Sequence, residues 1–575
     1  MSDGQLITYK INTMKNLKYI FFSFLLLGLW SCNEVEDVLE DNRASIEEPE
    51  MLPALSIEGT GLDFSNYIAV GPSFSAGVSD GTVFLASQNN SWPNIMSMEF
   101  AKVGGGEFKQ PTMDDNYGGL SLGPDNGVPL TEGGTRVVGP RLVFGGAGPV
   151  PLESVVGPVT VQTDLLNPPT GPFNNLGVPG ARSFHFVAPG YGNLANLAAG
   201  LANPYATRLT GSTPNASIIE LAAAQNPSFF TLSLFGGNDV LGYATGGADQ
   251  AADGITPLTT FEAALNGALT ALTANGAKGV VSGTPHVTDL PYFTTVPHNP
   301  LDPSSPELAA QIPLLNQIYG AINGVYTFLE ANNPGLDLSE RVIVFETDEA
   351  NPLVIRDEAL TDLSAQITGV LSANPAFPAF IAQFGLPAAA APLVAGLLGN
   401  TYGQSRPATE NDLIVLTAAS TIAEVDTDNV AFLMSQGLSQ ALAGQLSAIG
   451  VTLPMADKWV VTETEIDEII TATDAMNASV EAAANSFGIA YVDLQSILAQ
   501  ASSTGIMFDD YLLDTSLVTG GLVSLDGVHL TARGYAYMAN SFLEAIDMQY
   551  GSNFVASGSL AKAGDYPTNY SPLLQ

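Results

Sequence analysis

Short apolar runs that end in polar, glycine-containing turns most restrict how this chain can fold. The clearest runs are Tyr67 to Val70, Phe229 to Phe235, Gly279 to Ser282 and Ile489 to Asp493. The first is followed by Gly71-Pro72-Ser73 and the second by Gly236-Gly237-Asn238-Asp239. A short apolar run bounded by turn residues is typical of a strand that is buried on both faces. We therefore expect a sheet whose strands end in loops that carry polar side chains.

Helical segments separate these predicted strands. An Ala/Leu-rich stretch, Phe261 to Ala274, precedes the third strand, and an amphipathic run, Glu465 to Phe487, precedes the fourth. Strands that alternate with helices favour a parallel sheet with helices on both faces, which is an α/β fold. In such folds the side chains used for chemistry lie at the carboxyl ends of the strands.

Two long stretches interrupt this alternation. Residues 103–172 are rich in Gly, Pro and Val, which predicts an irregular or β-rich segment, whereas residues 300–460 are Ala/Leu-rich and predict helices. We interpret both as large insertions into a single domain that spans residues 61–575. In the second insertion, Leu386 to Leu398 could form a mobile lid, although a buried helix is the commoner use of such a segment.

The net charge of the chain argues against one class of partner. Among 575 residues, 57 are Asp or Glu and only 17 are Lys or Arg, which gives a formal charge of -40. The resulting field repels phosphate backbones, so we expect no nucleic-acid partner. The 46% of hydrophobic residues is enough for a large core, so the chain is not disordered in bulk.

The segment that begins at Met14 has the organisation of a signal peptide. Lys15 and Lys18 precede an apolar run from Tyr19 to Trp30, which is too short to span a membrane comfortably. A basic start followed by a short apolar run is typical of a secreted protein.

The residues that end this run, Leu29-Trp30-Ser31-Cys32, resemble the lipobox of bacterial lipoproteins. The resemblance implies that Cys32, the only cysteine, is lipidated and becomes the new N-terminus. We therefore expect a signal peptide with an upstream extension over residues 1–31 and an acidic tether over residues 32–60. The protein would then be anchored in the bacterial cell envelope, at the outer membrane. The alternative is an ordinary secretory signal with an incidental cysteine.

A pattern near the C-terminus carries the chemistry. Asp526-Gly527-Val528-His529-Leu530-Thr531 is followed by Ala532-Arg533-Gly534-Tyr535. An Asp three residues before a His can hold one imidazole nitrogen by a hydrogen bond while the other nitrogen faces a nucleophile, as serine activation requires. The D-x-x-H spacing alone is common by chance, but with the L-T and G-Y that follow it resembles the last sequence block of the SGNH/GDSL hydrolases.

Three earlier segments are similar to the other blocks of that family, in the same order. The first is Ile68-Ala69-Val70-Gly71-Pro72-Ser73-Phe74, the second is Asn175 to Ala181, and the third is the G-x-N-D of Gly236 to Asp239. The resemblance implies a catalytic triad of Ser73, Asp526 and His529. It also implies an oxyanion hole made by the Ser73 and Gly180 backbone N–H groups and the Asn238 side chain. A three-layer α/β/α, flavodoxin-like SGNH fold without cofactor or metal would follow.

The first block departs from the family pattern at two positions. Pro72 stands where the family has Asp, and Phe74 stands where it has Leu. Proline removes one backbone N–H and fixes φ near a value that a turn accepts, but the Ser73 N–H remains. We expect an intact oxyanion hole in an altered turn, with reduced activity as one conceivable result.

Other serines and histidines were weighed as alternatives. Ser79 and Ser121 each lie in a G-x-S-x-G pattern, but neither directly follows a predicted strand, as a nucleophile elbow requires. The remaining histidines, His185, His286 and His298, lack partners at metal-ligand spacing.

These features together predict a serine ester hydrolase whose substrate is a lipid or another acyl ester. A polysaccharide O-acetylesterase is an alternative within the same chemistry. A surface binding lipoprotein that has lost turnover is an alternative of a different class, suggested by Pro72. Beyond the ester substrate, we expect contact with a membrane through the lipid anchor.

Overall fold

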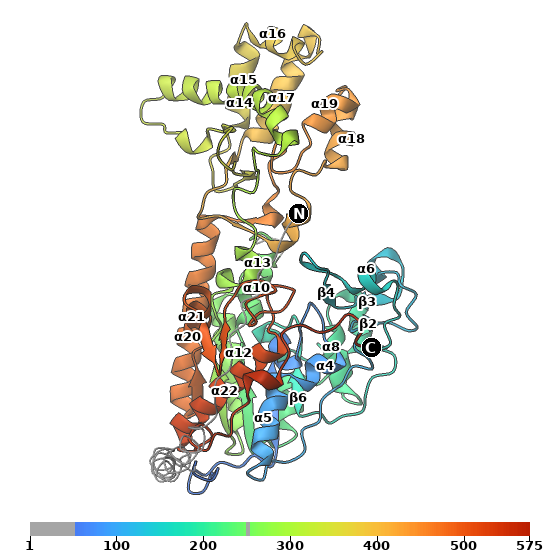
Figure 1. The fold of residues 1–575 in the computed structure, drawn as a ribbon, viewed down its shortest axis with the longest axis vertical. Helices are drawn as coiled ribbons and strands as arrows, with labels where there is room; N and C mark the ends of the chain where they lie inside the picture. The colour runs from blue at the N-terminus through green and yellow to red at the C-terminus, as the bar shows by residue number, and fades with distance from the viewer. Residues whose placement is uncertain (1–51, 249–252) are drawn as a thin grey trace, which may run out of the picture. The chain divides into compact units, whose positions relative to one another are not determined.

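Five parallel strands form the central sheet, in the order β13-β8-β7-β1-β6 (Figure 1). The computed structural model describes residues 52–248 and 253–575. The strands are β1 (Tyr67–Gly71), β6 (Asn175–Gly177), β7 (Phe229–Leu232), β8 (Lys278–Ser282) and β13 (Ala490–Val492). Because β1 lies between β6 and β7 and all three are parallel, the loops that follow them open at the same edge of the sheet.

The sequence prediction of a parallel α/β sheet is confirmed, and four strands occupy the predicted runs. β6 was not predicted as a strand. Its three residues, Asn175-Leu176-Gly177, contain one large apolar side chain and offer no periodicity. Pairing with β1 therefore defines this strand, through the register of Ala69 with Asn175 and Gly71 with Gly177.

Long helices pack beside the sheet, an arrangement compatible with an α/β/α fold. They include α5 (Trp92–Ala101), α12 (Leu258–Thr273), α20 (Glu463–Phe487), α21 (Leu494–Ser503) and α22 (Ala532–Tyr550). Helix α12 contacts α20, and α22 contacts α5 and β13. Trp92 of α5 stacks on Phe542 of α22 with ring centroids 4.4 Å apart. Shorter helices are α3 (Ser73–Ala76), α4 (Leu85–Asn89), α7 (Ser183–Phe186), α8 (Pro204–Thr210), α9 (Ile218–Ala223), α10 (Gly237–Thr245) and α13 (Pro291–Thr294).

The 103–172 segment is irregular and contains two small antiparallel pairs, β2-β3 and β4-β5. Its elements are β2 (Leu120–Ser121), β3 (Arg136–Val138), β4 (Leu142–Phe144), β5 (Pro149–Pro151) and α6 (Leu152–Val156). Two buried arginines hold it. Arg136 lies against Asp125 and Glu153 at 2.8 and 2.9 Å. Arg141 donates through Nε to the Asn116 carbonyl at 2.8 Å.

The 300–460 segment is mainly helical and forms what we call the helical lobe, coloured yellow to orange in Figure 1. Its helices are α14 (Pro306–Asn332), α15 (Ser364–Ala373), α16 (Phe377–Ala382), α17 (Ala391–Tyr402), α18 (Thr427–Ser435) and α19 (Gln440–Gln445). Two short antiparallel pairs, β9 (Val354–Arg356) with β10 (Ser405–Pro407) and β11 (Leu413–Ile414) with β12 (Val460–Val461), lie within it or at its base. A hairpin of β14 (Ile506–Phe508) and β15 (Tyr511–Leu513) precedes α22.

The predicted signal peptide and Cys32 lie outside the described residues. Within the described part of the chain, none of the helices combines the length and the apolar character needed to cross a membrane.

Gly177 at the end of β6 offers a test of how tightly the sheet packs against the α3 turn. A Cβ atom at this position would lie 2.6 Å from Ala76 Cα and 2.7 Å from the Ser75 carbonyl carbon, both of them backbone atoms. We expect Gly177→Ala to lower the free energy of unfolding by about 1–3 kcal/mol or more, because overpacking forces the backbone to shift. Urea titration followed by circular dichroism measures this change.

Gly320→Ala is the matched control. Gly320 is exposed on α14 and a Cβ there meets no atom within 4 Å. Since alanine favours the helix over glycine, this change should raise stability by about 0.5–1 kcal/mol. Equal effects of the two substitutions would contradict the packing described here.

Candidate active site

Ser73 lies just beyond the carboxyl end of β1, the strand next to the edge strand β6. β1 ends at Gly71, and Ser73 begins the short helix α3. A Cβ at Gly71 would lie 2.8 Å from both the carbonyl and the hydroxyl oxygen of Ser233, so only glycine fits. Ser73 is 5% exposed, and within the described residues its hydroxyl makes no hydrogen bond.

Pro72 takes part in the turn through its carbonyl group. The Ser75 and Ala76 amides donate to this carbonyl at 3.1 and 3.2 Å, which begins α3. The missing N–H of Pro72 therefore does not prevent the turn from forming. The Ser73 N–H donates to no acceptor in the described residues, so it is free to bind an oxyanion.

The other two predicted donors follow the strands on either side of β1. Gly180 lies three residues after β6, has a φ of 75°, and its N–H has no acceptor among the described residues. Asn238 is in the first turn of α10, after β7, and its Nδ2 donates to the Ala181 carbonyl at 2.9 Å. This bond uses one of the two amide hydrogens and ties Asn238 to the Gly180 loop.

Asp239 is hydrogen-bonded to Ser183, which follows the same loop. Its carboxylate is fully buried and accepts hydrogen bonds from the Ser183 amide at 2.8 Å and the Ser183 hydroxyl at 2.7 Å. Burial raises the pKa of this carboxyl group, although the bonds from Ser183 act in the opposite direction. The two polar residues of the G-x-N-D block therefore differ: Asp239 holds the loop at Ser183, and Asn238 keeps one amide hydrogen free.

Asp526 and His529 form the closest contact of the site, with His529 Nδ1 2.7 Å from Asp526 Oδ2. Asp526 Oδ1 accepts the backbone N–H groups of Val528 and His529 at 2.9 and 2.8 Å. Burial alone would raise the pKa of Asp526, but the His529 imidazole and these amides outweigh it and hold that pKa well below its usual range. Asp526 is therefore a stable anion that fixes the orientation of the imidazole.

The other imidazole nitrogen, His529 Nε2, is buried and has no hydrogen-bond partner among the described residues. The Phe74 ring lies beside the imidazole, with ring centroids 5.2 Å apart. The structure thus brings Asp526 and His529 together and places Phe74, the neighbour of Ser73, against them. It does not join Ser73 to His529 by a hydrogen bond, and catalytic hydrogen bonds of this kind often tighten only when substrate binds.

The turn after Ser73 is attached to α22, the helix that follows His529. Val78 donates its N–H to the Ser73 carbonyl at 3.0 Å, and the buried Tyr535 hydroxyl donates to the Val78 carbonyl at 2.6 Å. Gly534 lets the start of α22 lie close to the Leu522 backbone, since a Cβ there would collide with the Leu522 carbonyl oxygen. The G-Y that follows the D-x-x-H motif therefore connects the two halves of the site.

Asp80 is a site residue that the sequence analysis missed. It is 1% exposed, and its N–H donates at 3.0 Å to the Ser524 hydroxyl, which in turn donates to Asp526 at 3.1 Å. Its carboxyl group accepts the Leu525 N–H at 3.1 Å. Burial raises the pKa of Asp80 to about 7, and the charge of Asp526 adds to the rise. The Asp80-Gly81 pair was a turn signal, but nothing in the sequence indicated its partner.

The first insertion and the segment that leads into the helical lobe both contact this region. From the first insertion, Leu142 donates its N–H to the Asp80 carbonyl at 2.8 Å. From the entry to the helical lobe, Tyr292 donates its N–H to the Gly527 carbonyl at 3.0 Å. A Cβ at Gly527, whose φ is 75°, would lie 2.8 Å from Tyr292 N, so glycine is required in the Asp526–His529 turn.

The two competing serines are engaged elsewhere. Ser79 donates its hydroxyl to the Leu530 carbonyl at 3.1 Å, and Ser121 donates to the Thr163 carbonyl at 3.4 Å. Both are 1% exposed. A hydroxyl group committed to a backbone carbonyl is a poor candidate for a nucleophile.

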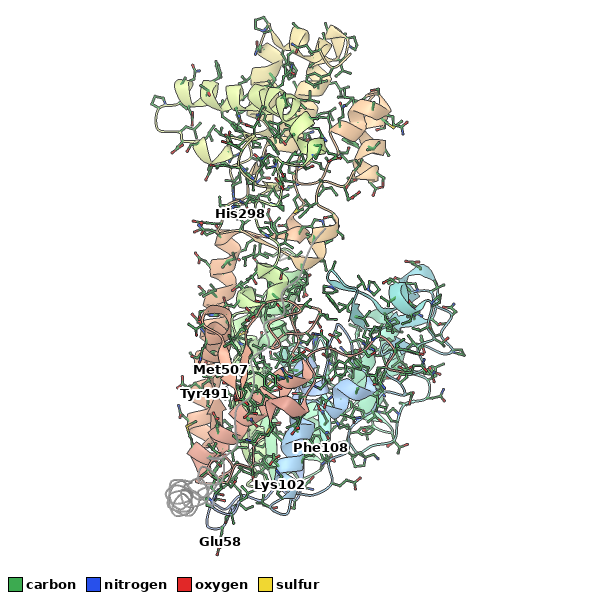
Figure 2. The ribbon with its side chains drawn as sticks, viewed as in Figure 1. Glu58, Lys102, Phe108, His298, Tyr491 and Met507 are labelled. Atoms are coloured by element: carbon green, nitrogen blue, oxygen red, sulfur yellow. The ribbon has the colours of Figure 1, made fainter. Side chains whose placement is uncertain are left out.

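The remaining histidines lie apart from the Asp526–His529 pair. His185 Nδ1 accepts the Arg182 N–H at 3.1 Å, and burial, with Arg182 nearby, lowers its pKa to about 4. His286 Nε2 lies 2.8 Å from Asp474. His298 lies where the chain enters the helical lobe (Figure 2).

One group of side chains in the described part of the chain is spaced to share a cation, and it contains no histidine. It consists of Glu358, Asp457 and Glu465. Glu465 already accepts hydrogen bonds at 2.7 and 2.8 Å from the amide and hydroxyl of Thr462, as the cap of α20. A helix cap therefore accounts for its position.

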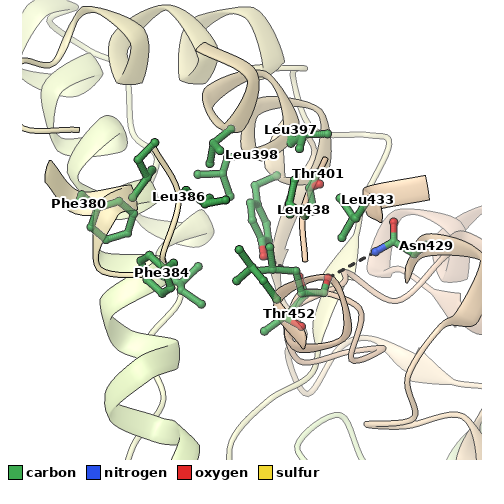
Figure 3. Close-up of a pocket in the computed structure, with 16 residues that line it drawn as sticks. Phe380, Phe384, Leu386, Leu397, Leu398, Thr401, Asn429, Leu433, Leu438 and Thr452 are labelled. Carbon is green, nitrogen blue, oxygen red and sulfur yellow. Dashed lines mark hydrogen bonds between the residues drawn. The ribbon is translucent and has the colours of Figure 1, made fainter. Parts of the chain in front are cut away.

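The Leu386–Leu398 segment forms most of α17 and borders an apolar pocket inside the helical lobe (Figure 3). Phe380, Phe384 and Leu433 are among the other residues that line it, and none of Ser73, Asp526 and His529 does. The segment is thus a packed helix that borders a pocket of its own, and the lid interpretation gains no support.

The chain matches no protein-family model, no curated protein and no solved structure.

Replacing Asp80 should change how stability depends on pH. An acid whose pKa is raised on folding contributes stability that is full below its unfolded pKa and is lost as pH rises through its folded pKa, here about 7. Between about pH 4 and about pH 8 the wild type should therefore lose up to about 4 kcal/mol that Asp80→Asn does not lose. Asparagine tolerates the φ of 52° at this position and keeps the oxygen that accepts from Leu525.

Denaturant titrations across this pH range measure the difference. Asp467→Asn, at an exposed position on α20, is the control and should follow the wild-type curve. Parallel curves for wild type and Asp80→Asn would show that Asp80 is ionised throughout.

Proposed function

We propose that the protein hydrolyses carboxylic esters through an acyl-enzyme on Ser73. One observation carries the proposal: Asp526 holds His529 Nδ1 at 2.7 Å, while His529 Nε2 is free and lies next to the turn that bears Ser73. A carboxylate–imidazole pair with its second nitrogen unoccupied is the arrangement that activates a serine hydroxyl.

In this mechanism His529 Nε2 removes the Ser73 proton as the serine oxygen attacks the ester carbonyl carbon. The N–H groups of Ser73 and Gly180 and the free hydrogen of the Asn238 amide bind the negative oxygen that develops. His529 then passes the proton to the alcohol oxygen as the carbon–oxygen bond breaks. A water molecule, activated by the same nitrogen, releases the carboxylic acid from Ser73.

The three donors support the proposal by their position. They follow β1, β6 and β7, which are adjacent and parallel in the sheet, so all three lie on loops that leave the same edge. The Ser73 and Gly180 amides have no competing acceptor in the described residues. We further propose that the α/β architecture is the three-layer SGNH fold, on the order of the four sequence blocks.

A binding protein with the same fold and little turnover is the second candidate. The observation in its favour is that Ser73 and His529 are not hydrogen-bonded while Pro72 occupies the altered turn. Retention of the Asp526–His529 pair and of both free amides favours the enzyme, since a chain without turnover has no use for them.

Substitution of the nucleophile separates these candidates. For the purified full-length protein, Ser73→Ala should lower kcat for aryl acetate or butyrate on the order of 10⁴-fold or more, because the proposed attacking oxygen is removed. Asn238→Ala should cost about 100- to 1000-fold through the lost oxyanion donor. Initial rates at saturating ester measure both effects.

Ser121→Ala is the control and should keep the wild-type rate, since Ser121 lies in β2 and bonds to Thr163. Equal rates in wild type and Ser73→Ala would exclude Ser73 as the nucleophile. A wild-type protein without measurable turnover would favour the binding protein.

We also propose that Cys32 carries a lipid anchor that holds the protein at the outer membrane of a bacterial cell envelope. Expressed in a bacterium, Cys32→Ala should move the protein from the membrane fraction to the soluble fraction, because the only acceptor for the lipid is lost. Detergent phase partitioning measures this, with Ser31→Ala as a control that keeps the thiol. Retention of Cys32→Ala in the membrane would contradict the anchor.

A further inference from the structure

An apolar cavity lies directly beside the candidate triad. Its volume is about 50 Å³. Phe74, the residue after Ser73, lines it, and so do Val528 and Leu530, which flank His529. Helices α21 and α22 supply further walls, including Leu498 and Met538. The cavity is therefore bounded by both chain segments that carry the triad.

The lining restricts what can enter. None of the side chains around the cavity is charged, and two of them, Tyr537 and Ser541, carry a hydroxyl group. Ser541 already donates to the Tyr537 carbonyl at 3.2 Å. A sugar or a charged head group would lose its hydrogen bonds with water here and gain none in return. An alkyl chain makes no hydrogen bonds with water, so its burial carries no such cost.

The volume restricts the length of that chain. A dry cavity of about 150 Å³ accommodates a benzene molecule, and about 10–15 Å³ is needed for a single water. A cavity of about 50 Å³ lies between these limits. It has room for a few methylene groups, and a long acyl chain would have to displace packed side chains.

We propose that this cavity receives the alkyl part of the substrate's acyl group, which makes the protein an esterase for short acyl esters of about two to four carbons. The inference rests on ester hydrolysis at Ser73. In the acyl-enzyme the acyl carbon is bonded to Ser73, and Phe74, the next residue in the chain, lines the cavity. The pocket of the helical lobe in Figure 3 does not suit this purpose, since Phe74, Val528 and Leu530, the neighbours of Ser73 and His529, do not line it.

Changing the size of the cavity tests the proposal. The probes are aryl esters of acetate, butyrate, hexanoate and octanoate, hydrolysed by the full-length protein. Leu498 is 6% exposed, belongs to α21 and lines the cavity. Leu498→Ala should raise the ratio of kcat/KM for hexanoate to kcat/KM for butyrate about 10-fold. Leu498→Phe should lower the ratio of kcat/KM for butyrate to kcat/KM for acetate about 10-fold.

Two further variants keep the test decisive. Leu269→Ala removes the same atoms from a fully buried position on α12 that does not line the cavity, so it should leave the chain-length profile unchanged. Met538→Ala enlarges the cavity from α22 and replaces Leu498→Ala should that variant fail to fold, as judged by thermal unfolding.

The outcomes separate the two levels of inference. Ser73-dependent hydrolysis with an optimum at octanoate, or a profile that neither Leu498→Ala nor Met538→Ala shifts, overturns the acyl cavity and leaves ester hydrolysis standing. Absence of any Ser73-dependent hydrolysis overturns both. A short-chain optimum that moves with Leu498 and Met538 but not with Leu269 supports both.

Discussion

The Gly81 backbone N–H donates to Asp526 at 2.8 Å across 445 residues of sequence, and the site depends on this junction. Asp80 and Ser79 add bonds to Ser524 and to the Leu530 carbonyl on either side of it. Since the turn from Ser73 to Val78 is continuous with Gly81, these bonds set where the serine lies relative to His529. The sheet positions the groups proposed to bind the oxyanion, and the junction positions His529, the proposed base.

The two carboxyl groups at this junction have pKa values shifted in opposite directions. The His529 imidazole and the amides around Asp526 hold its pKa below the usual range, whereas burial raises the pKa of Asp80. Two neighbouring carboxyl groups repel each other when both are ionised, so one of them has a raised pKa. Burial and the charge of Asp526 both favour the protonated form of Asp80.

The sequence was sufficient for the parallel sheet, because strands such as Phe229 to Leu232 are continuous apolar runs. It also predicted the contact between Asp526 and His529, because their three-residue spacing is a local signal. It missed β6, which is defined by pairing with β1, and Asp80, which matters only because Ser524 and Leu525 pack against it. It could not assign the role of the insertions, since the contacts of Leu142 and Tyr292 with the site connect residues far apart in the chain. Long-range contacts of this kind leave no periodic pattern.

The order in which the two halves of the site are synthesised has a consequence for folding. Ser73 and the first strands are synthesised, and can form local structure, well before Asp526, His529 and α22. Closing a loop of this length is slow relative to local structure formation, and until it closes Tyr535 cannot reach Val78 and the apolar faces that α22 covers stay open. During synthesis Ser73 is therefore present before His529, its proposed base, and the same step that brings the two together lets α22 cover the core.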